Sequence, residues 1–191
     1  MKVGLDEVQS RQPGFLEALL ADARVAAAYR GERMEFRSSL DGVLQALRLM
    51  LQTDAFLALA AYRLKARLKA LGIPVLPWLA HRLAIGSGAI SIADTAVVHP
   101  GVFIPNGQVV VHGLVEIHAG ATLQPWVTVG PLGAGVRGPT IRPYARIGAG
   151  AKVMGEIEVG ANARVGTNAV VLEDVPPNTT VVGMPARAIT D

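Results

Sequence analysis

The chain contains no cysteine and few aromatic residues. Disulfide bonds, thiolate catalysis and cysteine metal ligands are therefore excluded for its 191 residues. Aromatic residues make up 5% of the chain and charged residues 17%, whereas 51% are hydrophobic. A chain of this composition forms a folded core, and that core must consist mainly of Val, Ile, Leu and Ala. The scarcity of large rings favours flat, repetitive packing.

The sequence also lacks a long apolar run, a basic block and a secretory signal. Its most apolar helical stretch, residues 55–62, is soon interrupted by Arg63, Lys65 and Arg67 and is too short to span a bilayer. The first residues, MKVGLDEVQSRQPG, contain no apolar segment after the basic residue. The formal net charge of +3 comes from scattered Lys and Arg without an aromatic stripe. We therefore expect a cytoplasmic protein that binds neither membranes nor nucleic acid.

The first half of the chain predicts an α-helical N-terminal domain over residues 1–88. Apolar residues recur at helical spacing over about residues 13–31, 38–51 and 53–72, with capping residues or Gly at the ends. The segment VLPWLAHRLAIGSG then supplies a short last helix and a Gly-rich linker. Beyond this linker the period changes.

Residues 89–191 repeat with a period of six. A helix repeats every 3.6 residues and a strand every two, so neither alone accounts for this spacing. It predicts a left-handed parallel β-helix of hexapeptide repeats, in which each hexad supplies a short strand and a corner, and three hexads close one turn. The expected inward residues are Ile92, Val98, Ile104, Val110, Ile117, Leu123, Val129, Ile141, Ile147, Val153, Val159, Val165 and Val171.

Small residues and two interruptions complete this pattern. Alanines recur four places after the inward positions, and glycines suit the tight corners. These residues are Ala145, Ala151, Ala163 and Ala169, and Gly148, Gly160 and Gly166. The segment GLVE between Val110 and Ile117 shifts the frame, and PLGAGVRGPT is too long for a corner, which predicts a protruding loop near 131–140. Loops that leave a rigid scaffold commonly carry function.

The C-terminal run IGAGAKVMGEIEVGANARVGTNAVVLEDVPPNTTVVGMPARAI resembles hexapeptide-repeat acyltransferases, in particular the serine O-acetyltransferase family. The resemblance continues through TLQPWVTVG and VVHPGVFI, and through TDAF and AAYRLKARLKALGIP in the helical part, so it covers most of the chain after about Phe36. It implies acetyl-CoA as cosubstrate, no metal, and a homotrimer with active sites between neighbouring prisms. Pairing of two trimers by the helical domains would give a dimer of trimers.

The resemblance also implies positions for the cofactor. Matching the family's cofactor positions onto this chain gives Gly130, Ala149 and Thr167. Lys152 and Arg187 are candidates for phosphate contact. For each of these residues, an ordinary corner or surface role is the alternative.

Acetyl transfer from a thioester to an alcohol requires a base for the hydroxyl proton and donors for the oxyanion. Histidines are the plausible bases of this chain. His112 falls where the resemblance implies the catalytic histidine, although a surface or packing histidine is the alternative. His99 and His118 each follow an inward residue, so they should stack in a structural role, and His81 lies in the helical part.

Three groups that the family usually carries are missing. Val97 and Val111 stand in place of two aspartates, and Gly138 replaces a second histidine in the protruding loop. The adjacent arginine survives as Arg137, which we expect to bind an acceptor carboxylate; a solvated loop arginine is the alternative. These losses argue against unaltered serine recognition.

A lost orienting carboxylate is costly, by about 10⁴ in turnover in a serine protease. We hypothesise that Glu116, which lies near His112 in sequence, is the substitute partner of this histidine. A backbone carbonyl is the other candidate.

Three functions remain open. The first is an acetyl-CoA-dependent O-acetyltransferase that acts on serine or a related small hydroxylated acceptor. The second is a non-catalytic trimeric scaffold or regulator that has lost the catalytic dyad. The third is a zinc-dependent hydratase with His99, His112 and His118 as ligands, although their hexad positions do not all coincide.

Overall fold

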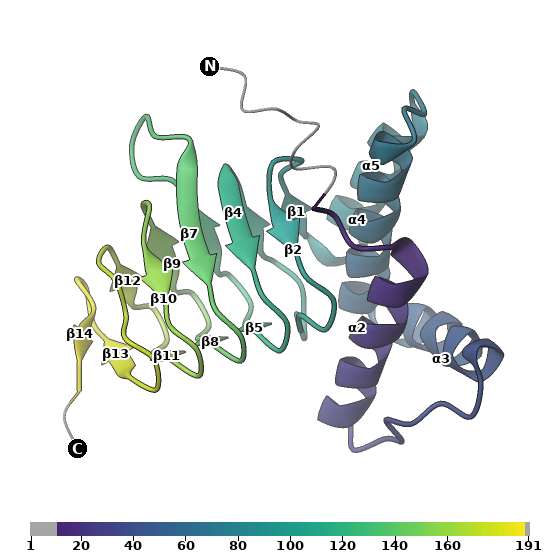
Figure 1. Ribbon diagram of the computed structural model, residues 1–191, viewed down its shortest axis with the longest axis horizontal. Helices are drawn as coiled ribbons and strands as arrows, with labels where there is room; N and C mark the ends of the chain where they lie inside the picture. Colours follow the sequence, from purple (N-terminus) through teal and green to yellow (C-terminus); the bar gives the residue numbers. More distant parts are fainter. Residues whose placement is uncertain (1–10, 190–191) are drawn as a thin grey trace.

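The computed structural model of the protein describes residues 11–189. Helices gather at one end of an elongated molecule, and the strands are stacked away from them toward the C-terminus (Figure 1). The expectation that the chain begins without a secretory signal concerns residues that lie mostly outside the described ones. Within residues 11–189, no helix is both long enough and apolar enough to cross a membrane.

Four helices precede the strands and match the runs expected from the sequence. They are α2 (Phe15–Tyr29), α3 (Ser39–Gln52), α4 (Asp54–Ala70) and α5 (Leu76–Gly88). The hydroxyl of Ser38 caps α3 by accepting a hydrogen bond from the backbone N–H of Asp41 at 3.2 Å. Buried residues such as Ala23, Leu49 and Phe56 pack α2, α3 and α4 together.

A buried ion pair fastens α2 to α4 and to the first strands. The Nε atom of Arg63 lies 3.0 Å from a carboxylate oxygen of Asp22, and both side chains are at most 3% exposed. Asp22 also accepts from the backbone N–H of Gly101 at 2.8 Å, and Arg63 donates to the carbonyl oxygens of Val98 and His99. The helical part and the strands therefore share one buried polar network.

The strands form three sheets that run along the molecule. The first sheet contains β1 (Ser91–Ile92), β3 (Val110–Val111), β6 (Thr128–Gly130), β9 (Lys152–Met154) and β12 (Val170–Val171). The second contains β2 (Val97–Val98), β4 (Leu114–Ile117), β7 (Arg137–Ile141) and β10 (Glu158–Val159). The third contains β5 (Thr122–Leu123), β8 (Arg146–Ile147), β11 (Arg164–Val165), β13 (Thr180–Val182) and β14 (Arg187–Ala188).

From β1 to β13, consecutive strands belong to different sheets, so the chain winds as a three-sided coil. All pairs are parallel except β13 with β14, where the chain turns back at its end. Apart from Val110, the inward series forms one continuous core inside the coil, and the four expected alanines are fully buried within it. The period of six thus marks the residues that stack from one turn to the next.

The frame shift lies earlier than the sequence predicted. Val110 is 42% exposed, whereas Val111 is 1% exposed and occupies the inward position in register with β1 and β6. The extra residue therefore lies between Ile104 and Val111. Gly107 and Gln108 take positive φ angles of 74° and 57° there, and the tight turn that they make absorbs the additional residue.

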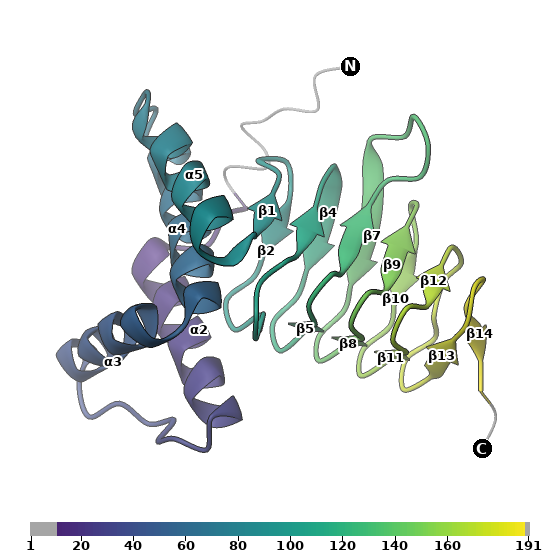
Figure 2. The ribbon, with the colours of Figure 1, turned by 180° about the vertical axis from the view of Figure 1, so that it is seen from behind.

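The second interruption is shorter than expected. Residues 131–136 leave the coil as a loop, and Arg137–Ile141 then forms β7, the long strand below that loop in Figures 1 and 2. The register between β4 and β7 shifts at a β-bulge. Leu114 pairs with Arg137 and Glu116 pairs with Thr140, so β7 contains one more residue than β4 between these two pairs. Arg137 and Gly138 are therefore strand residues with fixed neighbours.

Candidate active site

His112 lies at the corner between the first and second sheets. Its backbone N–H donates to the carbonyl oxygen of Val129 at 3.0 Å, which stacks this corner on the following turn. The imidazole covers Gly130, where an added Cβ would lie 2.3 Å from the His112 Cε1 atom. Gly130 therefore provides the space for the ring. The side chain of His112 is exposed and forms no hydrogen bond with any residue from 11 to 189.

A cleft of about 430 Å³ opens beside His112, between α5 and the first sheet. Lys65, Lys69, His81 and Asp94 also line this cleft. Asp94 pairs with both lysines, and its distance to the Lys65 Nζ atom is 3.1 Å. Burial lowers the pKa of Lys65, although the carboxylate of Asp94 opposes this shift. The cleft thus places the imidazole of His112 next to a compact cluster of charges.

Glu116 does not orient His112, which corrects the expectation from the sequence. Its Oε1 atom lies 2.9 Å from the Nε2 atom of His99 and 3.7 Å from that of His118. Its Oε2 atom accepts from Arg11 at 2.5 Å. The reason is its position on β4 in the second sheet, where the preceding turn presents His99, whereas His112 belongs to the previous corner.

The predicted stacking of His99 and His118 is confirmed. Their ring centroids lie 4.7 Å apart with an angle of 8° between the planes. His99, Glu116 and His118 form the group of metal-ligating side chains in the described part of the chain, and His112 is not a member. One copy of the chain therefore does not bring together the three histidines of the zinc-hydratase alternative.

Arg137 and Gly138 line a second cleft of about 320 Å³ along the second sheet, together with Val97. The Nη1 atom of Arg137 lies 3.2 Å from Glu156 Oε1 in an exposed ion pair. A Cβ on Gly138 would lie 2.6 Å from a methyl group of Val115. A histidine at this position would therefore require the Val115 side chain to move.

Apolar side chains occupy the two positions where the resemblance implies carboxylates. Val97 and Val111 are 3% and 1% exposed, so both are part of the core packing. Glu116 is the register partner of Val97 on the next turn, and together with Arg11 it lines the same cleft as Arg137. The carboxylate of this cleft thus lies one turn away from the position that the resemblance implies.

Two of the expected cofactor positions share an edge of the coil. Ala149 and Thr167 lie at consecutive corners between the third and first sheets, where the backbone N–H of Asn168 donates to the carbonyl oxygen of Ala149 at 2.8 Å. Lys152 lies beside this edge, with its Nζ atom 2.8 Å from the Trp126 carbonyl oxygen. We call this row of corners the cofactor edge.

The two other expected cofactor positions lie elsewhere. Gly130 lies beneath His112, across the first sheet from the cofactor edge. Arg187 lies in β14 at the C-terminal end, 3.5 Å from Glu173. The structure therefore brings Ala149, Thr167 and Lys152 together but not all five residues.

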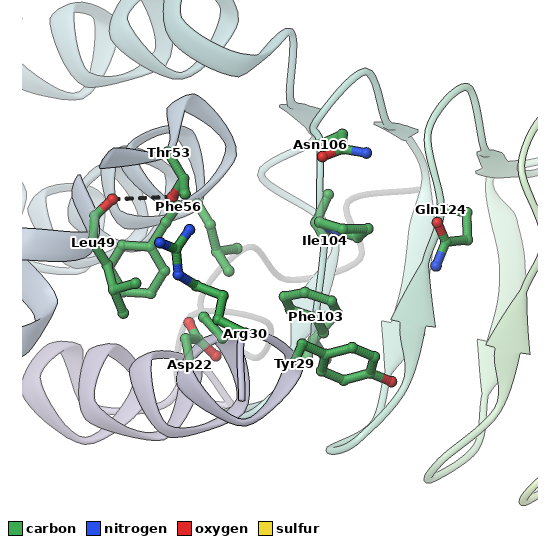
Figure 3. A pocket seen from close by; sticks show the side chains of 14 residues that line it. Asp22, Tyr29, Arg30, Leu49, Thr53, Phe56, Phe103, Ile104, Asn106 and Gln124 are labelled. Carbon is green, nitrogen blue, oxygen red and sulfur yellow. Dashed lines mark hydrogen bonds between the residues drawn. The ribbon is translucent and has the colours of Figure 1, made fainter. Parts of the chain in front are cut away.

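A cleft that the sequence did not reveal lies between the helices and the coil (Figure 3). Its volume is about 340 Å³. Arg30, the residue after α2, lines it on the helical side, and Asn106 and Gln124 line it on the side of the coil. Trp126 and Gln108 are joined by a backbone hydrogen bond of 2.8 Å, so these corners continue the cofactor edge toward the helices. In the sequence, this cleft could have been inferred from the interruption of the six-residue repeat at residues 105–108. The frame shift was instead predicted after Val110.

Comparison with known proteins identifies the family. No family model matches the chain. A serine acetyltransferase from Synechococcus elongatus is 38% identical over 146 residues, which cover 75% of this chain and 60% of that protein. A serine acetyltransferase from Buchnera aphidicola is 30% identical over an alignment that covers 91% of this chain and 70% of that protein. The chain belongs to the serine acetyltransferase family.

Solved structures of the family have the same fold. The soybean serine acetyltransferase apoenzyme superposes with a TM-score of 0.75 at 32% identity, over 94% of this chain and 71% of that one. Serine acetyltransferases in complex with CoA and with serine show the same likeness. The chain spans about 60–70% of the length of the curated relatives. The resemblance inferred from the hexapeptide ending is thereby confirmed.

Proposed function

We propose that this chain is an acetyl-CoA-dependent O-acetyltransferase that acts on the hydroxyl of serine or a related small hydroxylated acceptor. The observation that carries the proposal is family membership across 91% of the chain. The fold we assign is a left-handed parallel β-helix of residues 89–191 that follows a helical domain of residues 1–88. The three parallel sheets and the six-residue step support this assignment.

Coenzyme A is expected along the cofactor edge. Exposed backbone at Ala149 and Thr167 offers hydrogen bonds to the pantetheine arm, and Lys152 and Arg187 offer cations to its phosphates. At its helical end this edge leads into the cleft of Arg30 and Asn106. The thioester would then lie close to a cleft of sufficient size for a small acceptor.

His112 is the proposed general base, and Arg137 the proposed partner of an acceptor carboxylate. The imidazole removes the hydroxyl proton while the acceptor oxygen bonds to the thioester carbonyl carbon. The carbon–sulfur bond then breaks, and the CoA thiolate leaves with the proton. Within one chain His112 lies across the first sheet from the cofactor edge. A homotrimer of cytoplasmic chains, in which one copy presents His112 to the cofactor edge of the next, accounts for this separation.

Release of free CoA tests the proposal. Acetyl-CoA should yield free thiol with serine, threonine or homoserine as acceptor, and His112→Ala should reduce this rate by about 10²–10⁴. Glu17→Ala, an exposed change in α2 away from this cleft, should retain the wild-type rate. Full activity of His112→Ala would show that another group is the base.

A non-catalytic scaffold is the second candidate, because Val97 and Val111 fill with core methyl groups the positions where carboxylates are expected. Calorimetry distinguishes the two functions. A scaffold would show no acetyl-CoA binding, or would bind acetyl-CoA without releasing thiol in the presence of any acceptor.

A further inference from the structure

We propose that His99, Glu116 and His118 form a binding site for a divalent transition-metal ion of the zinc type. This inference departs from the expectation of a metal-free protein and does not depend on acetyl transfer. The site lies on the second sheet, at its corner toward the third sheet, and is distinct from the corner that carries His112.

The coil itself places the three side chains together. The backbone N–H of His99 donates to the carbonyl oxygen of Ile117, and that of His118 donates to Ile141, so the two histidines hold equivalent corner positions on consecutive turns. The turn spacing forces their rings to stack at 4.7 Å. Glu116 extends from the strand that leads into His118, so its carboxylate reaches both rings.

The candidate ligand atoms of the three side chains lie close together, and one of them lacks a hydrogen-bond partner among the described residues. One ring nitrogen of His99, one of His118 and a carboxylate oxygen of Glu116 lie within 4.8 Å of one another. The Glu116 Oε1 atom is 2.9 Å from His99 Nε2 but 3.7 Å from His118 Nε2. The latter nitrogen is shielded from solvent and has no hydrogen-bond partner in the described part of the chain. A cation between the three atoms would satisfy it.

Zinc binds the neutral form of an imidazole and the ionised form of a carboxylate. Burial lowers the pKa of His118, with the charge of Arg142 acting in the same direction and that of Glu116 against it. Burial raises the pKa of Glu116, but hydrogen bonds from His99 and Arg11 outweigh this effect and leave it below the usual value.

Two nitrogens and one carboxylate oxygen suit zinc, cobalt or nickel better than calcium or magnesium, which prefer oxygen ligands. Zinc bonds to these atoms are about 2.0–2.2 Å long, which separates the ligand atoms of a tetrahedral site by about 3.3–3.6 Å. The contact of Glu116 with His99 must therefore lengthen on binding, and that with His118 must shorten. Arg11 and Arg142 are the cations that face the site, and Arg11 must yield its contact with Glu116. Arg11 is 51% exposed in this ion pair, so the cost of moving it is small.

Metal titration of the tag-free chain tests the site. After treatment with a chelator, calorimetry with zinc chloride should show one ion bound per chain, and cobalt(II) should give an absorption band typical of tetrahedral coordination. His118→Ala and Glu116→Gln should each weaken zinc binding by about 10-fold or more, since each removes a ligand. His81→Ala should bind as the wild type does, because His81 lies outside the cluster.

Circular dichroism of each variant shows whether the coil has formed, and Glu116→Gln keeps the shape of the side chain. The proposal is overturned if the folded wild-type chain takes up no zinc or cobalt. It is equally overturned if folded Glu116→Gln and His118→Ala variants retain wild-type affinity.

Discussion

At the scale of single residues, the coil constrains its corners more strictly than its faces. Turns of the coil stack so closely that a corner residue touches the backbone of the next turn. Gly160 illustrates this, because an added Cβ would lie 2.4 Å from the backbone nitrogen of Pro177. The φ angle of Gly160 is not positive. Glycine is therefore required at this corner because a side chain has no room there.

The variant Gly160→Ala should lower the free energy of unfolding by about 1–3 kcal/mol, the usual cost of forcing a methyl group into a packed interior. Gly86 is the matched control, since it lies in α5 with no atom within 4 Å of an added Cβ. Gly86→Ala should raise stability by about 0.5–1 kcal/mol, because alanine is the better helix former. Urea denaturation measures both. Equal stability of Gly160→Ala and the wild type would show that the corner has slack.

Prediction from sequence succeeded for residues whose neighbours are set by the repeat. The inward series and the stacked pair of His99 and His118 follow from a fixed step of six. Val110 was assigned wrongly because both Val110 and Val111 are apolar, so composition does not distinguish the inward residue from the outward one. The prediction that Glu116 is the partner of His112 was also wrong. It relied on their proximity in the sequence, whereas the Glu116 partner Arg11 lies 105 residues away in the chain.

At the scale of elements, the junction of α2, α4 and the first strands depends on buried charges. Asp22 and Arg63 satisfy each other and three backbone groups of the coil. Such a network fixes the angle at which helices meet strands, whereas apolar contacts tolerate sliding. The helix boundaries were predictable from local breakers, but this network was not, since its members come from three distant segments.

Asp22→Ala should lower the free energy of unfolding by about 3–5 kcal/mol, because it leaves the Arg63 guanidinium buried without a partner. Glu17→Ala, an exposed change in the first turn of the same helix, should cost less than about 1 kcal/mol. Replacing both members, as in Asp22→Ala with Arg63→Met, should restore part of the loss. Thermal denaturation of these three variants and of Arg63→Met alone measures this coupling, and additive losses in the double variant would contradict it.

At the scale of the whole molecule, the clefts are distributed along different edges of one coil. His112 and Arg137 flank the corner between the first and second sheets, whereas the cofactor edge lies on the other side of the first sheet. A single chain therefore does not bring all the expected groups to one place. Assembly of several copies is the physical way to unite them, and the exposed apolar surface of the helical part indicates where further copies would meet.

One face of α3 carries a stripe of leucines spaced by four, three and four residues, which places them on the same side of the helix. Leu40, Leu44, Leu47 and Leu51 are between 50% and 90% exposed.

Burying this leucine stripe against the same stripe of another copy would stabilise the pairing of two trimers, whereas a glutamate in the stripe would have to lose its hydration. If two trimers pair through this stripe, Leu44→Glu with Leu51→Glu should halve the mass measured by sedimentation equilibrium. Gln52→Glu adds a charge beside the stripe and should leave the mass at the wild-type value. Since the coil and the cofactor edge are untouched, the double variant should bind acetyl-CoA as the wild type does, and an unchanged mass would mean that α3 lies outside the interface.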